Sequence, residues 1–182
     1  MKDLLKQLQN HAIQSAATAA KIIPISSVVI DERVRLKCLI PVCTKYNQNL
    51  MCPPNLPSVE EFRRVIRKYS KALFVQLAYE KRAALSKAAA RRNALRLHYI
   101  IHELEKRAFV LGFPLAAGLI GGSCKLCRKC VGPGYPCRHP LMARPSMEGM
   151  GIDVIQTAKR VGFPFDFSSR HSFFWNGLVL ID

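Results

Sequence analysis

The chain has 182 residues and seven cysteines, and its 28 Lys and Arg against 12 Asp and Glu give a formal net charge of +16 at pH 7. A chain of this length can bury a substantial core, so its cysteines are not needed as disulfide staples for a domain too small to fold. The longest apolar run, residues 111–120, is broken by glycine and proline and is too short to cross a bilayer, so no membrane contact is expected.

Residues 1–21 are predicted to form an amphipathic helix, because Leu4, Leu5, Leu8 and Ile13 recur at helical spacing. This start lacks the apolar stretch and cleavage site of a secretory signal, so we expect a cytoplasmic protein with reduced thiols. The positive charge favours an acidic electron-transfer protein, an anionic substrate or nucleic acid as partner.

Residues 22–30 are rich in Ile and Val and predict a strand that leads into the first cysteine loop, residues 38–57, where four prolines exclude regular structure. Ser58 and Glu61 form the pattern of a capping box, which predicts a helix directly after this loop. A buried strand over residues 72–78 and a long amphipathic helix ended by Gly112 follow.

Residues 115–120 predict another buried strand, and Gly121-Gly122 opens the second cysteine loop, residues 121–145. Ser146 is predicted to cap a last helix, and residues 173–181 to close the chain as a strand. This order predicts a single α+β domain over residues 1–182, with an α/β-like alternation and a mixed β-sheet on which helices pack. Both cysteine loops are expected near one edge or end of that sheet.

The second cysteine loop carries Cys124, Cys127 and Cys130 at spacings of three, and Cys137 after six further residues. Such a run can wrap three corners of a 4Fe-4S cluster, and Cys137 can supply the fourth. It resembles the bacterial ferredoxin run, in which only three residues precede the last cysteine. The alternative is tetrahedral zinc, although zinc modules usually divide their ligands into two separated pairs.

The first cysteine loop offers only Cys38, Cys43 and Cys52. Three thiolates leave one coordination position open, which a substrate-binding or Lewis-acid iron requires. Alternatively, Cys137 completes this site and leaves the vacancy in the second loop, since seven thiolates cannot complete two sites of four. A further alternative is that the three are merely buried small apolar residues.

Several motifs together resemble an uncharacterised prokaryotic family described as predicted metal-binding proteins. They are Cys38-x4-Cys43-x2-Tyr46, Cys52-Pro-Pro, Cys124-x2-Cys127-x2-Cys130, Cys137-Arg-His-Pro140 and Arg144-Pro-Ser-Met-Glu148-x2-Gly-Ile-Asp153-Val. The resemblance covers the chain from about residue 22 onward and implies a cysteine-bound metal, most simply iron-sulfur, without implying an activity. It departs from the family at Asn47, where relatives are expected to carry glycine.

Three charged residues near the second cysteine group are candidate cofactor-binding residues. Arg138 and Arg144 could raise the reduction potential of a cluster or hold an anion, and Glu148 could act as an acid or base near the metal. The alternatives are ordinary surface solvation for the arginines and a helix-dipole contact for the glutamate.

The sequence therefore predicts a metal-binding protein with one or two 4Fe-4S clusters and a role in electron transfer or an open-iron site. The alternative is a nucleic-acid-associated module whose zinc or cluster only folds the loops, with the basic run 81–96 contacting phosphates. No reaction and no catalytic residue is assigned.

Overall fold

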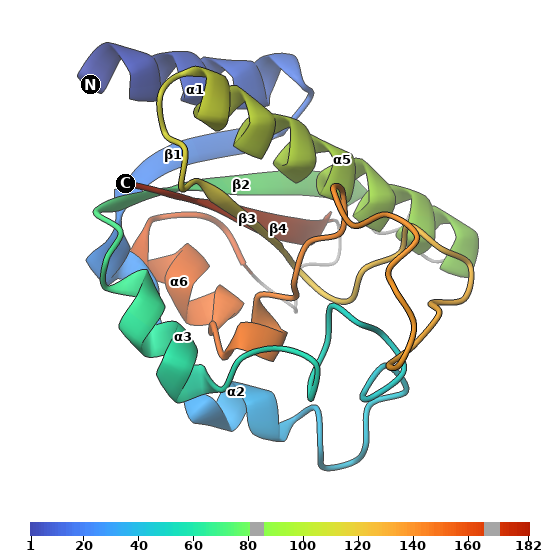
Figure 1. Ribbon diagram of the computed structural model, residues 1–182. Coiled ribbons are helices and arrows are strands. Elements are labelled where there is room, and N and C mark those ends of the chain that lie inside the picture. Colours follow the sequence, from blue (N-terminus) through green and yellow to red (C-terminus); the bar gives the residue numbers. More distant parts are fainter. Residues whose placement is uncertain (81–85, 166–171) are drawn as a thin grey trace.

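A four-stranded sheet forms the centre of the computed structural model, which describes residues 1–80, 86–165 and 172–182 (Figure 1). The strand order is β1-β2-β4-β3. The strands are β1 (Ala19–Pro24), β2 (Lys71–Glu80), β3 (Ala117–Ile120) and β4 (Ser172–Ile181). The α+β class is confirmed, but the three pairings between these strands are all antiparallel, so the sheet is not mixed as expected.

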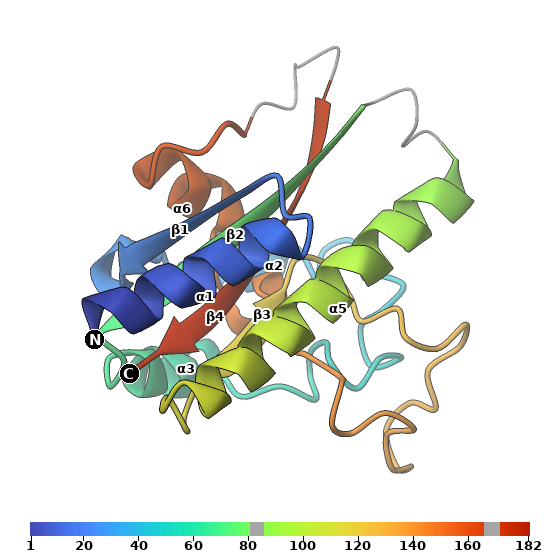
Figure 2. The same ribbon diagram turned by 90° about the horizontal axis from the view of Figure 1, so that it is seen from above.

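Helices cover both faces of the sheet (Figures 1 and 2). One face carries α1 (Lys2–Gln14) and α5 (Lys87–Val110); the other carries α2 (Glu32–Leu36), α3 (Val59–Ile66), α6 (Val154–Arg160) and the 3-10 turns η1 (Ile25–Ser27) and η2 (Glu148–Met150). No helix among the described residues combines the length and apolar character needed to cross a membrane.

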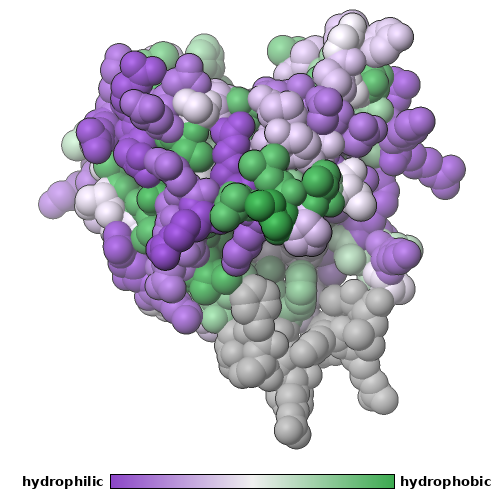
Figure 3. Space-filling model, turned by 90° about the horizontal axis from the view of Figure 1, so that it is seen from below, coloured by the Kyte–Doolittle hydropathy of each residue, from purple (hydrophilic) through white to green (hydrophobic). Residues whose placement is uncertain are grey.

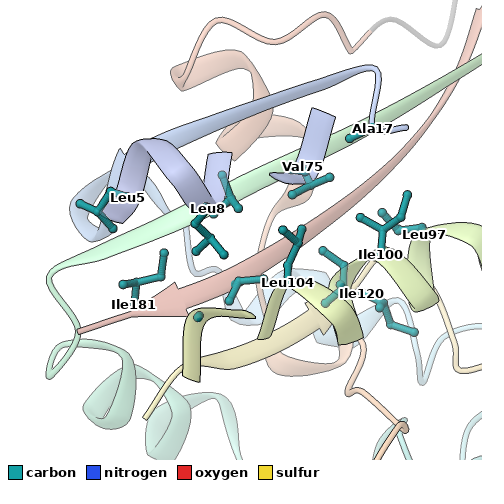
Figure 4. Packing of buried hydrophobic residues seen from close by; sticks show 14 of the residues in the cluster. Leu5, Leu8, Ala17, Val75, Leu97, Ile100, Leu104, Ile120 and Ile181 are labelled. Carbon is teal, nitrogen blue, oxygen red and sulfur yellow. The ribbon is translucent and has the colours of Figure 1, made fainter. Parts of the chain in front are cut away.

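Two hydrophobic cores lie on the two faces because side chains along a strand point alternately to opposite sides. Leu73 and Val75 of β2 belong to the core under α1 and α5, whereas Ala72 and Phe74 belong to the core over α3 and α6. Figure 4 shows Leu5 and Leu8 of α1 with Leu97, Ile100 and Leu104 of α5 around the first of these. The sheet and its helices therefore have cores built largely from residues outside the cysteine loops.

The N-terminal prediction is wrong in its boundaries. The first helix ends at Gln14 rather than near residue 21, and Ala16 takes a left-handed φ of 66° before β1 begins. The strand expected over residues 22–30 runs only over Ala19–Pro24, and beyond it Ile30 makes an isolated bridge to Ile152. The short helix α2, whose N-cap Asp31 accepts a hydrogen bond from the Arg33 amide, was not anticipated.

The last helix is also placed differently. Ser146 does not cap it: its hydroxyl accepts from the Gly149 amide in the turn that contains η2. Gly151 then turns the chain at a φ of 83°, and α6 begins after Asp153, which is the actual N-cap. The capping box of Ser58 and Glu61 is confirmed at the start of α3.

Candidate metal centre

The first cysteine loop connects α2 to α3. Cys38 directly follows the C-cap of α2, and the Cys43 amide donates to the Cys38 carbonyl over 3.0 Å. Asn47 adopts a left-handed φ of 52°, which explains why glycine suits this position and why asparagine, the next most tolerant residue type, can replace it. Cys52 is buried, Cys38 half-buried and Cys43 exposed.

The three thiols of this loop share one electrostatic environment with Glu148. Burial and then the neighbouring Cys43, Cys38 and Glu148 raise the pKa of the Cys52 thiol to about 12. Burial, Cys43 and Glu148 likewise raise the pKa of Cys38. Without a metal these two thiols are protonated at neutral pH, so a bound metal would displace protons.

Glu148 is held on η2 against the first loop. Its Oε2 accepts hydrogen bonds from the Gly122 amide and the Ser146 hydroxyl, both over 2.9 Å. The next residue, Gly149, is so close to the first loop that a Cβ there would lie 2.8 Å from Leu56 Cδ1 and 3.0 Å from Pro53 Cδ. Glu148 therefore lies beside the first loop, and its hydrogen bond from the Gly122 amide also joins it to the start of the second loop.

The second cysteine loop follows β3, and the other three cysteines of the loop influence the thiol of Cys124. Burial raises the pKa of Cys124, the Leu126 amide lowers it by hydrogen bonding, and Cys137, Cys130 and Cys127 raise it. Cys137 therefore contributes to the electrostatic surroundings of Cys124, and its place as fourth ligand of the second site stays a prediction. The His139 amide also donates to Cys137 Sγ over 3.4 Å.

The two loops are joined by one buried side chain. Asn49 Nδ2 donates to the Cys124 carbonyl over 2.9 Å, and Asn49 Oδ1 accepts from the Met51 amide over 3.0 Å. On the opposite side Arg91 of α5 donates to the Lys125 carbonyl over 2.7 Å. The Asn49 contact joins the two loops, and the Arg91 contact joins the second loop to α5.

The donors fit a thiophilic metal or cluster, although they are not closed around one. All seven cysteines are free thiols, and among the described residues no three Cys, His, Asp or Glu side chains converge as the shell of an ion. Soft sulfur donors select zinc or iron-sulfur clusters over hard cations. Backbone amides donate to the sulfurs of Cys124 and Cys137, and hydrogen bonds to ligand sulfurs are among the features that set the potential of an iron-sulfur cluster.

The two candidate arginines differ in their surroundings. Arg138 is exposed, and its Nη1 donates to the Lys129 carbonyl over 3.3 Å within the second loop. Arg144 is buried, and its Nη2 donates to Glu105 Oε1 over 2.7 Å and lies 3.1 Å from His102 Nδ1. Arg144 therefore anchors the end of the second loop to α5.

Trp175 of β4 lines two of the cavities beside the loops. The first-loop cavity, of about 380 Å³, is lined by Cys38, Cys43 and Glu148 together with β4 residues. The inter-loop cavity, of about 500 Å³, is lined by Cys124, Cys127 and Cys130 and by six cationic residues, namely Lys45, Lys87, Arg91, Lys125, Arg128 and Lys129. Lys125 lies over the Trp175 ring at 5.4 Å from its centroid, and burial lowers its pKa.

Sequence reasoning did not single out Asn49, Lys125 or Trp175. The only available signal was the aromatic run Phe173-Phe174-Trp175 at the start of a strand, which is unusual for a simple alternating pattern. Of the basic run 81–96, Lys81 and Arg82 lie outside the described residues.

The face of the molecule seen in Figure 3 carries apolar side chains gathered near its centre. Exposed apolar residues also occur at the end of α2 and the start of the first loop, namely Leu36, Leu39, Ile40 and Val42. Three of these lie between Cys38 and Cys43, so the segment joining two candidate ligands presents apolar surface to the outside.

One family model matches the chain, over residues 21–181, and its description is predicted metal-binding protein (DUF2284). No curated protein and no solved structure matches it.

Proposed function

Since the chain belongs to the family of predicted metal-binding proteins (DUF2284), we propose that its metal is iron, bound with sulfide as a 4Fe-4S cluster on the second cysteine loop. The observation that carries this proposal is the placement of Cys124, Cys127, Cys130 and Cys137 in one loop that follows β3. Four thiolates from one loop are the complete ligand set of such a cluster.

The residues around these thiols favour an electron-transfer role. When bound, the cluster would supply one-electron chemistry, which needs no acid or base from the protein. The Leu126 and His139 amides donate to ligand sulfurs, and exposed Arg128 and Arg138 lie on the same loop. Both features favour the more negative, reduced form and therefore raise the reduction potential.

The charge of the inter-loop cavity supports an acidic partner. Six cations from the first loop, α5 and the second loop line it beside Cys124, Cys127 and Cys130. An acidic electron-transfer protein could approach this surface with long-range attraction. A partner bound at this surface would lie close to the cysteines of the second loop, which would suit electron exchange.

The first loop is proposed to hold a second cluster or metal through Cys38, Cys43 and Cys52. Three thiolates leave one position for a substrate, and Glu148, which shifts the pKa of Cys38 and Cys52, is the carboxylate placed to exchange a proton there. The adjoining cavity supports a substrate-binding role for this site.

A second candidate function is a nucleic-acid-associated module in which zinc or a cluster only orders the loops. The observation in its favour is the same cationic lining, since phosphates bind Lys and Arg. A steep fall in affinity for RNA or DNA with rising salt would support it, because each phosphate contact releases a counterion.

Anaerobic purification with iron, zinc and acid-labile sulfide analysis tests the first proposal, together with electron paramagnetic resonance of the reduced protein. We expect iron and sulfide in equal amounts, loss of about one cluster in Cys127→Ser, and retention of that cluster in Cys52→Ser. Stoichiometric zinc without sulfide would refute the iron assignment. Unchanged iron in Cys127→Ser would refute the ligand set.

A further inference from the structure

The first-loop cavity differs in chemistry from the strongly basic protein around it. Its walls are mainly apolar, with aromatic side chains from β4 and the segment after α6 and aliphatic side chains from α2, α6 and the residues just before α6. These residues are Phe165, Phe173, Phe174, Trp175, Val34, Ile152, Val154 and Ile155. A volume of about 380 Å³ is within the range of small-molecule sites, and a cavity of about 150 Å³ already holds a benzene ring. One or two rings therefore fit.

The charged groups of this cavity are mostly carboxylates, and the amide side chain of the buried Asn176 also lines it. Two carboxylates, Glu148 and Asp153, face one ammonium group, that of Lys37, in a chain with a formal charge of +16. Two donors already hold Glu148 Oε2, and the Gln156 amide bonds Asp153 Oδ1. Because each carboxylate has a second oxygen and further lone pairs, both can still accept from a ligand. The cavity is thus suited to a molecule that donates hydrogen bonds and is unsuited to an anion.

The aromatic residues form two pairs, Phe173 with Trp175 and Phe165 with Phe174, because successive side chains of β4 point to opposite faces of the sheet. Phe173 and Trp175 pack edge to face with centroids 5.7 Å apart, and Phe165 lies 6.4 Å from Phe174. The neighbouring Asn176 is buried, and its Oδ1 accepts from Gln76 Nε2 over 3.0 Å. The β2 strand pairs along the whole of this segment, so the wall is formed before any ligand binds.

We infer that the first-loop cavity binds a small aromatic molecule carrying an amine or hydroxyl donor. The ring packs against the β4 aromatics, where a cationic amine also gains from the ring faces, and the donor group bonds Glu148. The ligand would lie next to Cys38 and Cys43, so its identification as substrate of the open metal position rests on the proposed function. The binding of the ligand does not rest on the proposed function, because none of the contacts described above involves the metal.

The test compares two probes that share a phenol ring and differ in charge, tyramine and 4-hydroxyphenylacetate. Titration calorimetry on the anaerobically purified protein should show tyramine binding at least tenfold more tightly. Trp175 is the only tryptophan of the chain, so its emission should change over the same concentration range. Equal affinities, tighter binding of the carboxylate, or binding that leaves Trp175 emission unchanged would overturn the inference.

A pair of variants checks the location. Val34→Phe adds bulk to a residue that lines the cavity and should weaken tyramine binding at least tenfold, whereas Val65→Phe adds the same bulk on the exposed side of α3 and should leave it unchanged. Equal binding by all three proteins would place the ligand elsewhere. Tyramine binding by protein that contains zinc and no sulfide would leave this inference standing and refute the iron assignment, so the two failures are distinguishable.

Discussion

Replacing Asn49 by alanine should weaken both cysteine loops at once. The buried side chain makes two hydrogen bonds, of 2.9 Å to the Cys124 carbonyl and 3.0 Å from the Met51 amide, and only 5% of its surface is exposed. A hydrogen bond contributes about 1 kcal/mol net, and leaving a buried partner unsatisfied costs about 1–3 kcal/mol. The change should therefore lower the free energy of unfolding by about 2–4 kcal/mol.

The assay is urea unfolding of the anaerobically purified protein, combined with the rate at which a chelator removes its metal. Gln48→Ala is the matched control, since the neighbouring side chain is exposed and its loss should cost under about 0.5 kcal/mol. Asn49→Asp keeps the acceptor for Met51 but places an oxygen against the Cys124 carbonyl. It should therefore lower the free energy of unfolding by at least half as much as Asn49→Ala does. The Asn49 side chain would not couple the loops if Asn49→Ala and Gln48→Ala had the same free energy of unfolding. The same would follow if Asn49→Ala sped metal loss from one loop only.

Three further predictions concern single residues. In metal-free protein at pH 8, Cys52 should react with iodoacetamide at least tenfold more slowly than in the unfolded chain, because burial raises its pKa to about 12. As the pH rises above about 9, the thiol of the unfolded chain loses its proton first. The free energy of unfolding should therefore fall with pH there, as urea unfolding at pH 8 and 10 would show. Glu105→Ala should cost about 3 kcal/mol in urea unfolding because it leaves the buried Arg144 guanidinium without its carboxylate, whereas Glu103→Ala, which removes an exposed ion pair, should cost under about 1 kcal/mol. Asn47→Gly should change stability by less than about 1 kcal/mol in thermal unfolding, whereas Asn47→Val should be destabilising by about 1–3 kcal/mol, because only the β-branched residue is strained at a φ of 52°. Equal melting temperatures for the two variants would contradict this.

The elements that follow a local rule were predictable from the sequence. Ser58 and Glu61 begin α3 through a capping box that involves only the residues of that turn. Residues 72–78 form a buried strand because a short continuous apolar run suits a position covered on both faces. The separation of the cysteines into two loops, each next to regular structure, was visible in the same way.

The features that depend on distant pairs were not predictable. Strand direction is set by which strands meet, so a mixed sheet was expected where the structure has an antiparallel one. Asn49 joins a carbonyl 75 residues away, and no periodicity or motif marks such a contact. Arg144 was interpreted from its position beside cysteines, although its partner Glu105 lies on α5, 39 residues earlier. A last helix from Ser146 was expected because its apolar spacing continues through Gly151, whose φ of 83° interrupts it.

The geometry of the first site depends on Gly149, a residue that has no side chain. Pro53 and Leu56 rest where its Cβ would be, and a proline ring has no rotamer by which to withdraw. A larger residue at 149 would push against Pro53 and Leu56 and so displace the end of the first loop. The distance across this site thus depends on the absence of a side chain at residue 149. A chain with a different residue there would need a different loop opposite it.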